Sequence, residues 1–286
     1  MKAILLIVIL SCSALLHAQE VLSNLMSNPM LKSKKFIPNK NKSALTLPFF
    51  DDFFYSSPVA DTYLWQRSSV FINRTYPINP ITAGVATFDG LNKDGVAYVI
   101  NMANPQGDAD TLVSQDINLS TVNTAYFMFY YQPQGLGDNP QVEDSLMLEF
   151  KDSNDNWNVE WKIAGSSFYE FKKIIILISS SDYLTNNFQF RFRNKATLSG
   201  NYDHWHIDYV KLDEFVNPID TSKLNDVSFV YRAPSFLKRY EQMPWIHFMN
   251  NKLAEMNDTA AIFLRNNGAS INVDYQYNVF EGNNLL

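Results

Sequence analysis

Cysteine is almost absent from this sequence, because Cys12 is the only one among 286 residues. It lies inside the N-terminal hydrophobic stretch, which we expect to be cleaved. The mature chain then has no disulfide, no cysteine-ligated metal and no thiol nucleophile.

Basic charge is also scarce. The chain carries 23 Lys and Arg against 29 Asp and Glu, with a formal net charge of -6 and a pI near 5.2. The one short basic run, Lys32, Lys34 and Lys35, is interpreted as a solvated tail. A nucleic-acid partner needs a clustered basic face, so we expect none.

Catalytic signatures are missing as well. The sequence has no G-x-S-x-G, no H-E-x-x-H and no glycine-rich phosphate loop. Glu143, Glu149 and Glu160 lie on neighbouring predicted strands, but with 29 acidic residues in the chain such proximity is expected by chance. No catalytic residue is therefore assigned.

Long hydrophobic runs are absent beyond the N-terminus, so we expect no transmembrane segment. At the N-terminus, Lys2 precedes the apolar run Ala3–Leu10, and small residues lead up to Ala18 and Gln19. This order is typical of a signal peptide. We predict a signal peptide at residues 1–18 and an extracytoplasmic location, either secreted or on the outer cell surface.

A second interpretation of the leader stays open. Ile9–Cys12 (ILSC) loosely resembles a lipoprotein signal, in which Cys12 would be lipidated and attach the chain to the outer membrane. Leu10 departs from the small residue usual at that point.

Aromatic and aliphatic residues are plentiful: 46% of the chain is hydrophobic and 14% aromatic, with 21 Phe and 15 Tyr. This favours strands around a packed core. Residues 19–46 are polar and rich in Asn, Lys and Ser, and are predicted to be a flexible N-terminal segment.

From residue 47 onwards the sequence predicts many short strands separated by turn formers. Evenly spaced strands without any long segment of helical period are typical of a jelly-roll β-sandwich, which we place at 47–216. The predicted strands are Phe49–Phe54, Val70–Ile72, Gly84–Phe88, Ala97–Ile100, Thr111–Val113, Ala125–Tyr131, Ser145–Phe150, Asn158–Ala164, Phe171–Ile178, Phe188–Asn194 and His204–Leu212. The continuous apolar run Ile174–Ile178 predicts a strand buried on both faces.

The remaining residues, 217–286, predict a second β unit. Its expected strands are Asp226–Tyr231, Ala260–Leu264 and Ile271–Val279. An immunoglobulin-like sandwich needs about 100 residues. We therefore expect a partial, truncated unit, which belongs to a longer protein or is completed by something else.

A histidine pair is the strongest candidate for a metal site in the sequence. Alternation along a strand places His204, His206 and Asp208 on one face, with Trp205, Ile207 and Tyr209 on the other. Two imidazoles and a carboxylate could bind zinc or iron, but a full ligand set is lacking. The favoured alternative is a closing strand with a polar, half-exposed face.

Two further patterns concern ligands. Asp152–Asn156 (DSNDN) has part of a calcium-loop pattern but lacks its glycine and glutamate, so a hairpin turn is favoured. Aromatic side chains could form a sugar-stacking platform, and the even spacing of Trp157 and Trp161 would let both point from one face of a strand. The candidates are Trp65, Trp157, Trp161 and Tyr202, with core packing as the favoured alternative.

Three stretches together resemble the jelly-roll modules of secreted Bacteroidetes proteins, related to cleaved-adhesin and MAM domains. They are the first strand Leu47–Phe53 (LPFFDDF), the middle segment Thr111–Leu119 and the closing strand Asp203–Leu212 (DHWHIDYVKL). Gly84–Asn92 (GVATFDGLN) also resembles a segment of type IX secretion clients. Such proteins usually end in a C-terminal sorting domain, and none is evident here. Either the chain is truncated, and the missing C-terminal region would attach it to the outer membrane, or the chain uses another export route.

The resemblance implies a structural calcium ion between the first and last strands. Asp51 or Asp52 would pair with Asp208, and Asp203 is a further candidate ligand. Calcium takes six to eight oxygen ligands, so these carboxylates would need loop carbonyls as well. The alternative is that they face water or cap turns.

Together these features predict a secreted or cell-surface, non-catalytic binding or adhesion module with a protein or glycan surface ligand. The alternative is an ancillary domain of a larger secreted hydrolase, active on peptide or glycan, whose catalytic part is absent here. A metal-dependent hydrolase using the histidine pair is a third hypothesis. Fold likeness alone does not decide among them.

Overall fold

The computed structural model describes residues 25–39, 43–214, 227–232 and 234–268, with scattered positions between 272 and 285. The predicted signal peptide and Cys12 lie outside the described residues. Among the described helices, none is long and apolar enough to cross a membrane.

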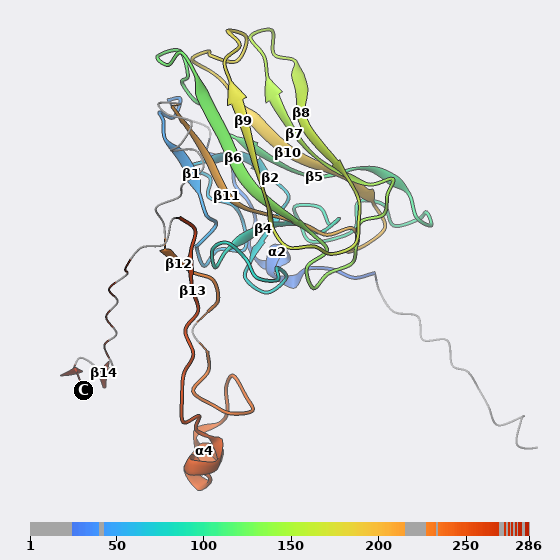
Figure 1. Cartoon of the computed structure of the whole chain (residues 1–286). Helices are drawn as coiled ribbons and strands as arrows, with labels where there is room; N and C mark the ends of the chain where they lie inside the picture. Colours follow the sequence, from blue (N-terminus) through green and yellow to red (C-terminus); the bar gives the residue numbers. More distant parts are fainter. Residues whose placement is uncertain are drawn as a thin grey trace, which may run out of the picture.

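Two antiparallel sheets form a sandwich, as predicted (Figure 1). The first has the order β3-β4-β11-β6-β9, with β1 paired to β11, and the second has the order β2-β5-β10-β7-β8. The strands of the first sheet are β1 (Phe49–Asp51), β3 (Phe71–Asn73), β4 (Val85–Phe88), β6 (Ala125–Pro133), β9 (Lys172–Ile178) and β11 (Trp205–Glu214). Those of the second are β2 (Trp65–Ser68), β5 (Gln106–Ser114), β7 (Ser145–Lys151), β8 (Trp157–Ala164) and β10 (Phe190–Thr197).

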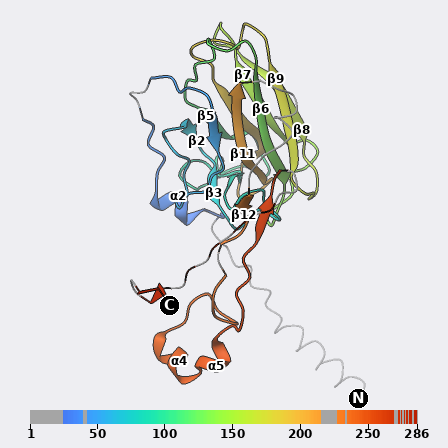
Figure 2. The same cartoon turned by 60° about the vertical axis from the view of Figure 1, so that its left-hand side comes forward.

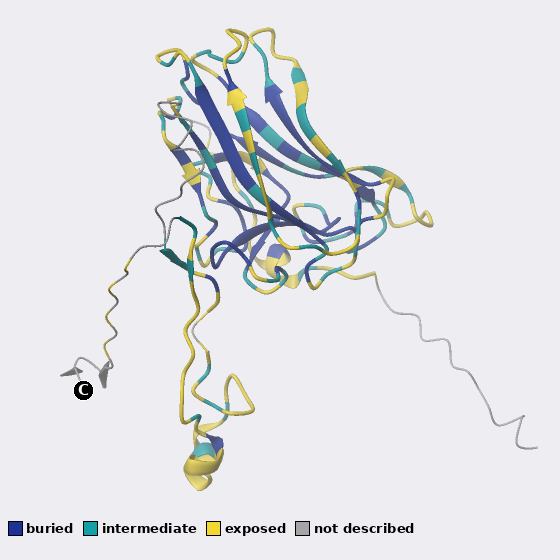
Figure 3. Cartoon of the chain, viewed as in Figure 1, coloured by how far each residue is buried: buried dark blue, intermediate teal, exposed yellow. Residues whose placement is uncertain are grey.

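Buried residues lie along the strands of both sheets (Figure 3), and the core between the sheets is rich in aromatic rings. Alternation puts Phe190 and Phe192 of β10 on the inner face, where both are fully buried, as the sequence predicts. Phe190 packs edge-on against Phe127 at 4.5 Å and Trp65 at 5.6 Å between ring centroids. Such edge-to-face contacts add to the burial of the rings.

Strand β11 changes neighbours half way along one edge. Trp205–Ile207 pair with β4, and Val210–Leu212 pair with β1. At the change, Tyr209 has a φ of 54° and the register with β6 shifts, which is the signature of a β-bulge. The bulge turns Tyr209 to the outer face, so the predicted placement of Tyr209 beside Trp205 and Ile207 is wrong.

Strand β9 differs from its prediction. Ile174–Ile178 lie at the edge of the first sheet, bonded on one side to β6. Ile174 and Ile176 pack on the core, but Ile175 is 40% exposed and Leu177 is 55% exposed. The expectation of burial on both faces is wrong because an apolar run does not say whether a second layer covers the sheet.

Two other strand assignments need correction. Ala97–Ile100 forms no strand and only bridges Leu91 through Ala97. Trp65–Ser68, for which no strand is predicted, is β2. Its polar residues Gln66 and Arg67 interrupt the apolar pattern because they face away from the core.

The N-terminal segment is part of the packed structure where it is described. Asn28 caps helix α2 (Pro29–Ser33), its Oδ1 accepting from the main-chain nitrogens of Met30 and Leu31. Leu31 is 1% exposed. Leu45 bridges Ile117 and joins the main core. The prediction of a flexible lead-in is wrong for these residues because a few apolar side chains anchor a polar segment.

The second unit is described in part, and it contains a two-stranded ribbon of β12 (Val227–Phe229) and β13 (Leu264–Asn266). Between them lie the short helices α4 (Trp245–Asn250) and α5 (Lys252–Glu255), which are apart from the sandwich in Figure 2. A further strand pair consists of β14 (Phe280–Glu281) and β15 (Asn284–Leu285). The expected strand at Ile271–Val279 lies largely outside the described residues, and the domain boundary at 216–217 stays a prediction.

The ribbon hydrogen-bonds to the loop of the sandwich that contains Asn79 and Ile81. Ser228 Oγ donates to the carbonyl of Ile81 at 2.8 Å, and the hydroxyl of Tyr231 donates to Asn79 Oδ1 at 3.0 Å. Arg265 donates to the carbonyl of Asn79 at 3.2 Å. Polar contacts therefore join the two units.

Candidate functional site

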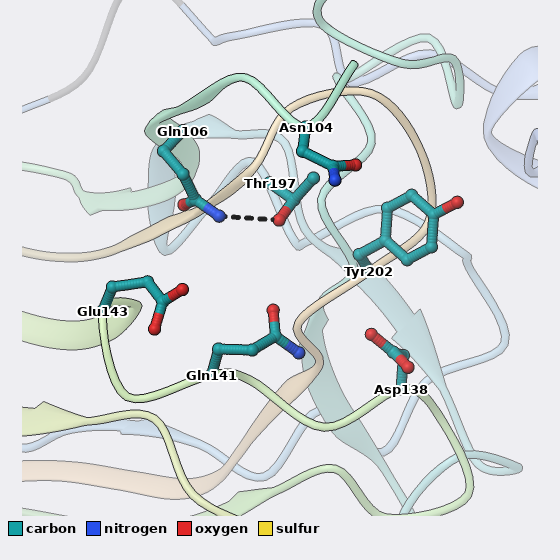
Figure 4. A pocket seen from close by; sticks show the side chains of 7 residues that line it. All are labelled: Asn104, Gln106, Asp138, Gln141, Glu143, Thr197 and Tyr202. Atoms are coloured by element: carbon teal, nitrogen blue, oxygen red, sulfur yellow. Dashed lines mark hydrogen bonds between the residues drawn. The ribbon is translucent and has the colours of Figure 1, made fainter.

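A polar pocket of about 520 Å³ opens at one end of the sandwich, where the β6–β7 loop, the β10–β11 loop and the start of β5 meet. In Figure 4 its side chains surround a common space, with Gln106 and Glu143 on one side and Asp138 and Tyr202 on the other. The lining residues are Asn104, Gln106, Asp138, Gln141, Glu143, Thr197 and Tyr202.

Loop geometry shapes this pocket. Gln134 and Gly135 adopt positive φ angles of 66° and 56°, which reverse the chain after β6. A side chain on Gly137 would lie 2.4 Å from the ring of His204. Glycine at that position therefore lets the loop that carries Asp138 lie directly over β11.

Two buried carboxyl groups lie beneath the pocket. Asp144 is 1% exposed and Asp203 is fully buried. Asp203 Oδ2 accepts from the main-chain nitrogen of Thr197 at 2.7 Å, and Asp144 Oδ2 accepts from that of Gln141 at 2.7 Å. Burial, followed by the charge of Asp203, raises the pKa of Asp144 to about 6, and burial also raises the pKa of Asp203.

His206 is completely enclosed. Its Nε2 lies 3.1 Å from the carbonyl of Gln134, an acceptor, so Nε2 carries the proton. Its Nδ1 then accepts from the Thr87 hydroxyl at 2.9 Å, and Asn73 Nδ2 donates to the same hydroxyl at 2.6 Å. Burial, reinforced by the neighbouring His204, lowers the pKa of His206 to about 3. Both nitrogens are used by the fold, so neither offers a lone pair to a metal.

His204 is also buried. Its Nδ1 accepts from the main-chain nitrogen of Asp138 at 3.0 Å, and its ring stacks on Tyr76 at 5.0 Å. Burial lowers its pKa to about 4. The expected half-exposed face of this strand is therefore wrong, because the 133–138 loop covers it. Among the described residues, no group of three or more His, Cys, Asp or Glu side chains forms a metal site.

Asp208 fastens a loop to β11. Its Oδ2 accepts from the main-chain nitrogens of Ile81 and Thr82, at 3.0 and 2.8 Å. The Thr82 hydroxyl lies 2.8 Å from Asp208 Oδ1 and 2.9 Å from the carbonyl oxygen of Asp52. Burial raises the pKa of Asp208 well above its usual value. Thr82 thus links the Asp208 carboxyl group to the main chain of Asp52, which follows β1.

The other carboxylates of the predicted calcium set are also engaged. Asp51 Oδ2 accepts from the indole nitrogen of Trp65 at 2.6 Å, and Asp51 Oδ1 accepts from the main-chain nitrogen of Phe53 at 2.8 Å. Burial raises the pKa of Asp51 to about 7. Asp52 accepts from the nitrogen of Phe54 at 3.0 Å. Asp203 lies instead beside Asp144, so the structure does not gather the four predicted residues into one ligand group.

The predicted aromatic platform is divided by the fold. Trp65 is fully buried, and Trp161 packs on the core. The register of β8 shifts between Val159 and Trp161, so Trp157 turns outward, where Arg191 lies 4.4 Å over its ring. The expectation that Trp157 and Trp161 share a face is therefore wrong. Of the four candidates, only Tyr202 lines the pocket.

The Asp152–Asn156 segment is a hairpin turn between β7 and β8, as predicted. Asp152 Oδ1 accepts from the main-chain nitrogens of Asn154 and Asn156, at 2.8 and 2.9 Å. The carboxylate therefore holds the turn.

Sequence reasoning missed most of the pocket. Asn104 and Gln106 lie at the entry to β5 and Gln141 and Glu143 lie in the β6–β7 loop, so the four form no motif in the sequence. The run Gln134–Pro140, with two glycines followed by Asp, Asn and Pro, was a usable signal, because such loops position functional side chains.

No protein-family model matches the chain, and no curated protein matches it either. Among solved structures, the K1 cleaved adhesin domain of Lys-gingipain from Porphyromonas gingivalis W83 aligns at 9% identity and a TM-score of 0.38, covering 59% of this chain and 98% of that one. The carbohydrate-binding module TmCBM61, solved with β-1,4-galactotriose, aligns at 13% identity and a TM-score of 0.35, covering 53% of this chain and 88% of that one. The CBM22-1 xylan-binding domain of Paenibacillus barcinonensis Xyn10C aligns at 7% identity and a TM-score of 0.32, covering 60% of this chain and 97% of that one. At such scores none of their ligands transfers to this chain. Its structural neighbours thus include adhesin domains and carbohydrate-binding modules, which are β-sandwich domains.

Proposed function

We propose that this chain is a non-catalytic binding module that takes a carbohydrate in the polar pocket at the end of the sandwich. The observation that carries the proposal is the lining of that pocket, which combines amide, carboxylate and hydroxyl groups around one aromatic ring. Sugar hydroxyls both donate and accept hydrogen bonds, so they require such a mixture.

The lining favours a polyol over an apolar ligand. Gln106, Gln141 and Asn104 each offer a donor and an acceptor, while Asp138 and Glu143 only accept when ionised. Tyr202 is 41% exposed, so its ring is available to stack against the C–H face of a sugar. Its hydroxyl supplies a further polar contact.

Binding to a panel of immobilised glycans, followed by calorimetry with the best ligand, tests the proposal. Tyr202→Ala should weaken binding at least about tenfold, or about 1.4 kcal/mol, because the stacking surface is lost. The matched control is Trp157→Ala, which removes an outward-facing aromatic ring on β8. Unchanged affinity in the control is expected.

Two results would contradict the proposal: retention of no glycan by the wild-type chain, or an equal loss of affinity in both variants. Selective capture of a lysine-rich peptide at the same pocket would instead favour a protein ligand, because Asp138 and Glu143 are acidic.

The finer parts of the function rest on sequence. Export rests on the N-terminal pattern, and membership of a Bacteroidetes type IX secretion pathway rests on resemblance. An ancillary role in a larger secreted hydrolase is compatible with the same pocket, because binding modules hold catalytic partners on their substrates.

A further inference from the structure

Basic residues that are far apart in the sequence gather on the outer face of the second sheet. In β10, Phe190 and Phe192 point into the core, so the alternate residues point outward. Directly opposed residues of antiparallel strands share a face, so the registers of the neighbouring strands extend this outer face across the sheet. The basic residues on it are Arg67 of β2, Lys151 of β7, Lys162 of β8 and Arg191, Arg193 and Lys195 of β10.

Acidic side chains neutralise only part of this basic face. Glu149, which is 3% exposed, accepts from Arg191 Nε at 2.6 Å and from Arg193 Nε at 2.8 Å. Arg193 also pairs with Asp108, and Lys151 pairs with Asp155 in the adjoining hairpin turn. The other three basic residues are exposed and form no ion pair with any described residue, namely Arg67, Lys162 and Lys195. The face is therefore positive, on a chain whose formal net charge is -6.

Arg191, in the middle of the face, is held in place by its neighbours. Its guanidinium lies 4.4 Å over the ring of Trp157, and its Nε is bonded to Glu149. Its two terminal nitrogens donate to no side chain or main-chain group of the described residues. A planar guanidinium binds an oxyanion such as a carboxylate through two parallel hydrogen bonds. Because this one is already fixed, it loses little freedom when it binds.

The remaining side chains of the face disfavour a protein or a nucleic acid as the ligand. Val113 and Met147 are each only 6% exposed, so Val159, at 51%, is the one large aliphatic side chain exposed among the described residues of this face. A protein interface needs a larger apolar centre. Single-stranded nucleic acid stacks its bases on exposed aromatic rings, but Arg191 lies over the ring of Trp157.

We propose that the outer face of the second sheet binds an acidic polysaccharide through its carboxylate or sulfate groups. Charge complementarity carries the proposal, because a linear polyanion needs a row of unneutralised cations and no apolar centre. The polymer crosses the strands between Arg67 on β2 and Lys162 on β8. The terminal nitrogens of Arg191 bind one of its acidic groups on the way.

This face is distinct from the pocket at the end of the sandwich and shares no residue with it. The pocket is lined by Asp138 and Glu143, which repel an acidic chain. The inference therefore does not rest on the function proposed for the pocket.

Binding of the whole chain to immobilised polysaccharides, measured by biolayer interferometry, tests the proposal. The probes are polygalacturonate, which carries carboxylates, dextran sulfate, which carries sulfates, and neutral dextran, which reports any contribution from the pocket. We expect binding to a polyanion that weakens as salt is added, because exposed charges are screened. The polyanion that binds more tightly identifies the acidic group.

The triple variant Arg67→Gln, Lys162→Gln, Lys195→Gln removes the three basic residues that lack an acidic partner. Polyanion binding should weaken at least about tenfold, because each exposed ion pair contributes modestly and three are lost together. Arg191→Lys keeps the charge but loses the planar fork, so it should also weaken binding.

The matched control is the triple variant Lys34→Gln, Lys173→Gln, Lys252→Gln, which removes the same charge from exposed positions off this face. It should keep wild-type affinity. Tyr202→Ala, in the pocket, should also leave polyanion binding unchanged.

The proposal is overturned if wild type binds neither polyanion, or if the two triple variants lose affinity equally, since net charge would then be responsible. Loss of polyanion binding in Tyr202→Ala would place the site in the pocket and overturn it as well. Tighter binding of single-stranded DNA than of either polyanion would show a nucleic-acid ligand instead. Should the first triple variant fail to fold by circular dichroism, unchanged affinity in each of its three single variants would overturn the proposal.

Discussion

Asp89 and Asp110 are both buried in the interior of the sandwich, at 1% and 0% exposure. Asp110 Oδ2 accepts from the nitrogen of Gly90 at 2.9 Å, and Tyr98 donates its hydroxyl to Asp110 Oδ1 at 3.0 Å. Asp89 Oδ1 accepts from the nitrogen of Leu91 at 3.1 Å. Burial raises the pKa of Asp89 to about 7, and burial together with the charge of Asp89 raises the pKa of Asp110 well above its usual value.

This pair predicts a pH dependence of stability. The folded state holds these protons more tightly than the unfolded state, whose aspartate pKa is near 3.8. Their stabilising effect is thus complete below about pH 4 and is lost as pH rises towards 7. The melting temperature of wild type should fall between pH 5 and 8, and in Asp110→Asn this fall should be smaller by several degrees. A change of 1 kcal/mol in unfolding free energy shifts the melting temperature by about 2–4 °C in a protein of this size. Thermal unfolding across that range measures this.

The exposed carboxylate variant Asp258→Asn is the control, and its pH profile should follow wild type. Burial also raises the pKa values of Asp51 and Asp208. Both residues are present in wild type and in Asp110→Asn, so their effect on the pH profile is the same in the two proteins and cancels in the comparison. Parallel profiles for Asp110→Asn and wild type would show that the pair does not titrate as stated.

At the scale of elements, the loop between β6 and β7 connects the histidines to the pocket. Gly135 and Gly137 lie so close to His206 and His204 that an added Cβ would come within 2.5 and 2.4 Å of the rings. The ring of His204 is also held by Tyr76, which stacks on it at 5.0 Å between centroids. The loop, the histidines and Asp138 therefore form one packed unit.

Gly137→Ala should lower stability by about 1–3 kcal/mol, because the new methyl group is forced against the His204 ring. Chemical denaturation measures the change. Leu136→Ala, at a 70% exposed side chain of the same loop, should cost little. Equal stability of Gly137→Ala and wild type would mean that the loop can shift away from β11 at no cost in free energy, which would contradict its close packing.

Bulges limit what alternation can predict. Strand β10 is regular from Phe190 to Phe192, and its faces follow directly from the sequence. In β8 and β11 an irregular residue shifts the register, so Trp157 and Tyr209 face the opposite way from the prediction. Period-2 reasoning fails there because one extra residue reverses every face beyond it.

At the scale of the whole molecule, the N-terminal segment closes one side of the sandwich. Leu31 packs with Val59 and Phe71, and the nitrogen of Asn28 donates to the carbonyl of Gly95 at 2.8 Å. A Cβ on Gly95 would lie 2.4 Å from the carbonyl of Asn28, so the contact is close. Residues on either side of the jelly-roll boundary predicted at 47 thus share one structure.

Leu31→Ala should destabilise the protein by about 2–4 kcal/mol, because it leaves a cavity in this cluster. Met30→Ala, 50% exposed on the same helix, is the matched control and should change stability little. Denaturant unfolding measures both variants. A value for Leu31→Ala as small as that of the control would mean that the segment contributes nothing to stability.

The sequence by itself determined the fold class, because strand alternation, turn residues and aromatic content all indicate an all-β sandwich. It also indicated the absence of thiol chemistry and predicted an exported chain. Only the tertiary structure decided the chemistry of individual side chains. His206 is sealed by a loop, Trp65 is buried, and Asp203 lies beside Asp144. Burial and partners come from elements distant in sequence, which local patterns do not encode.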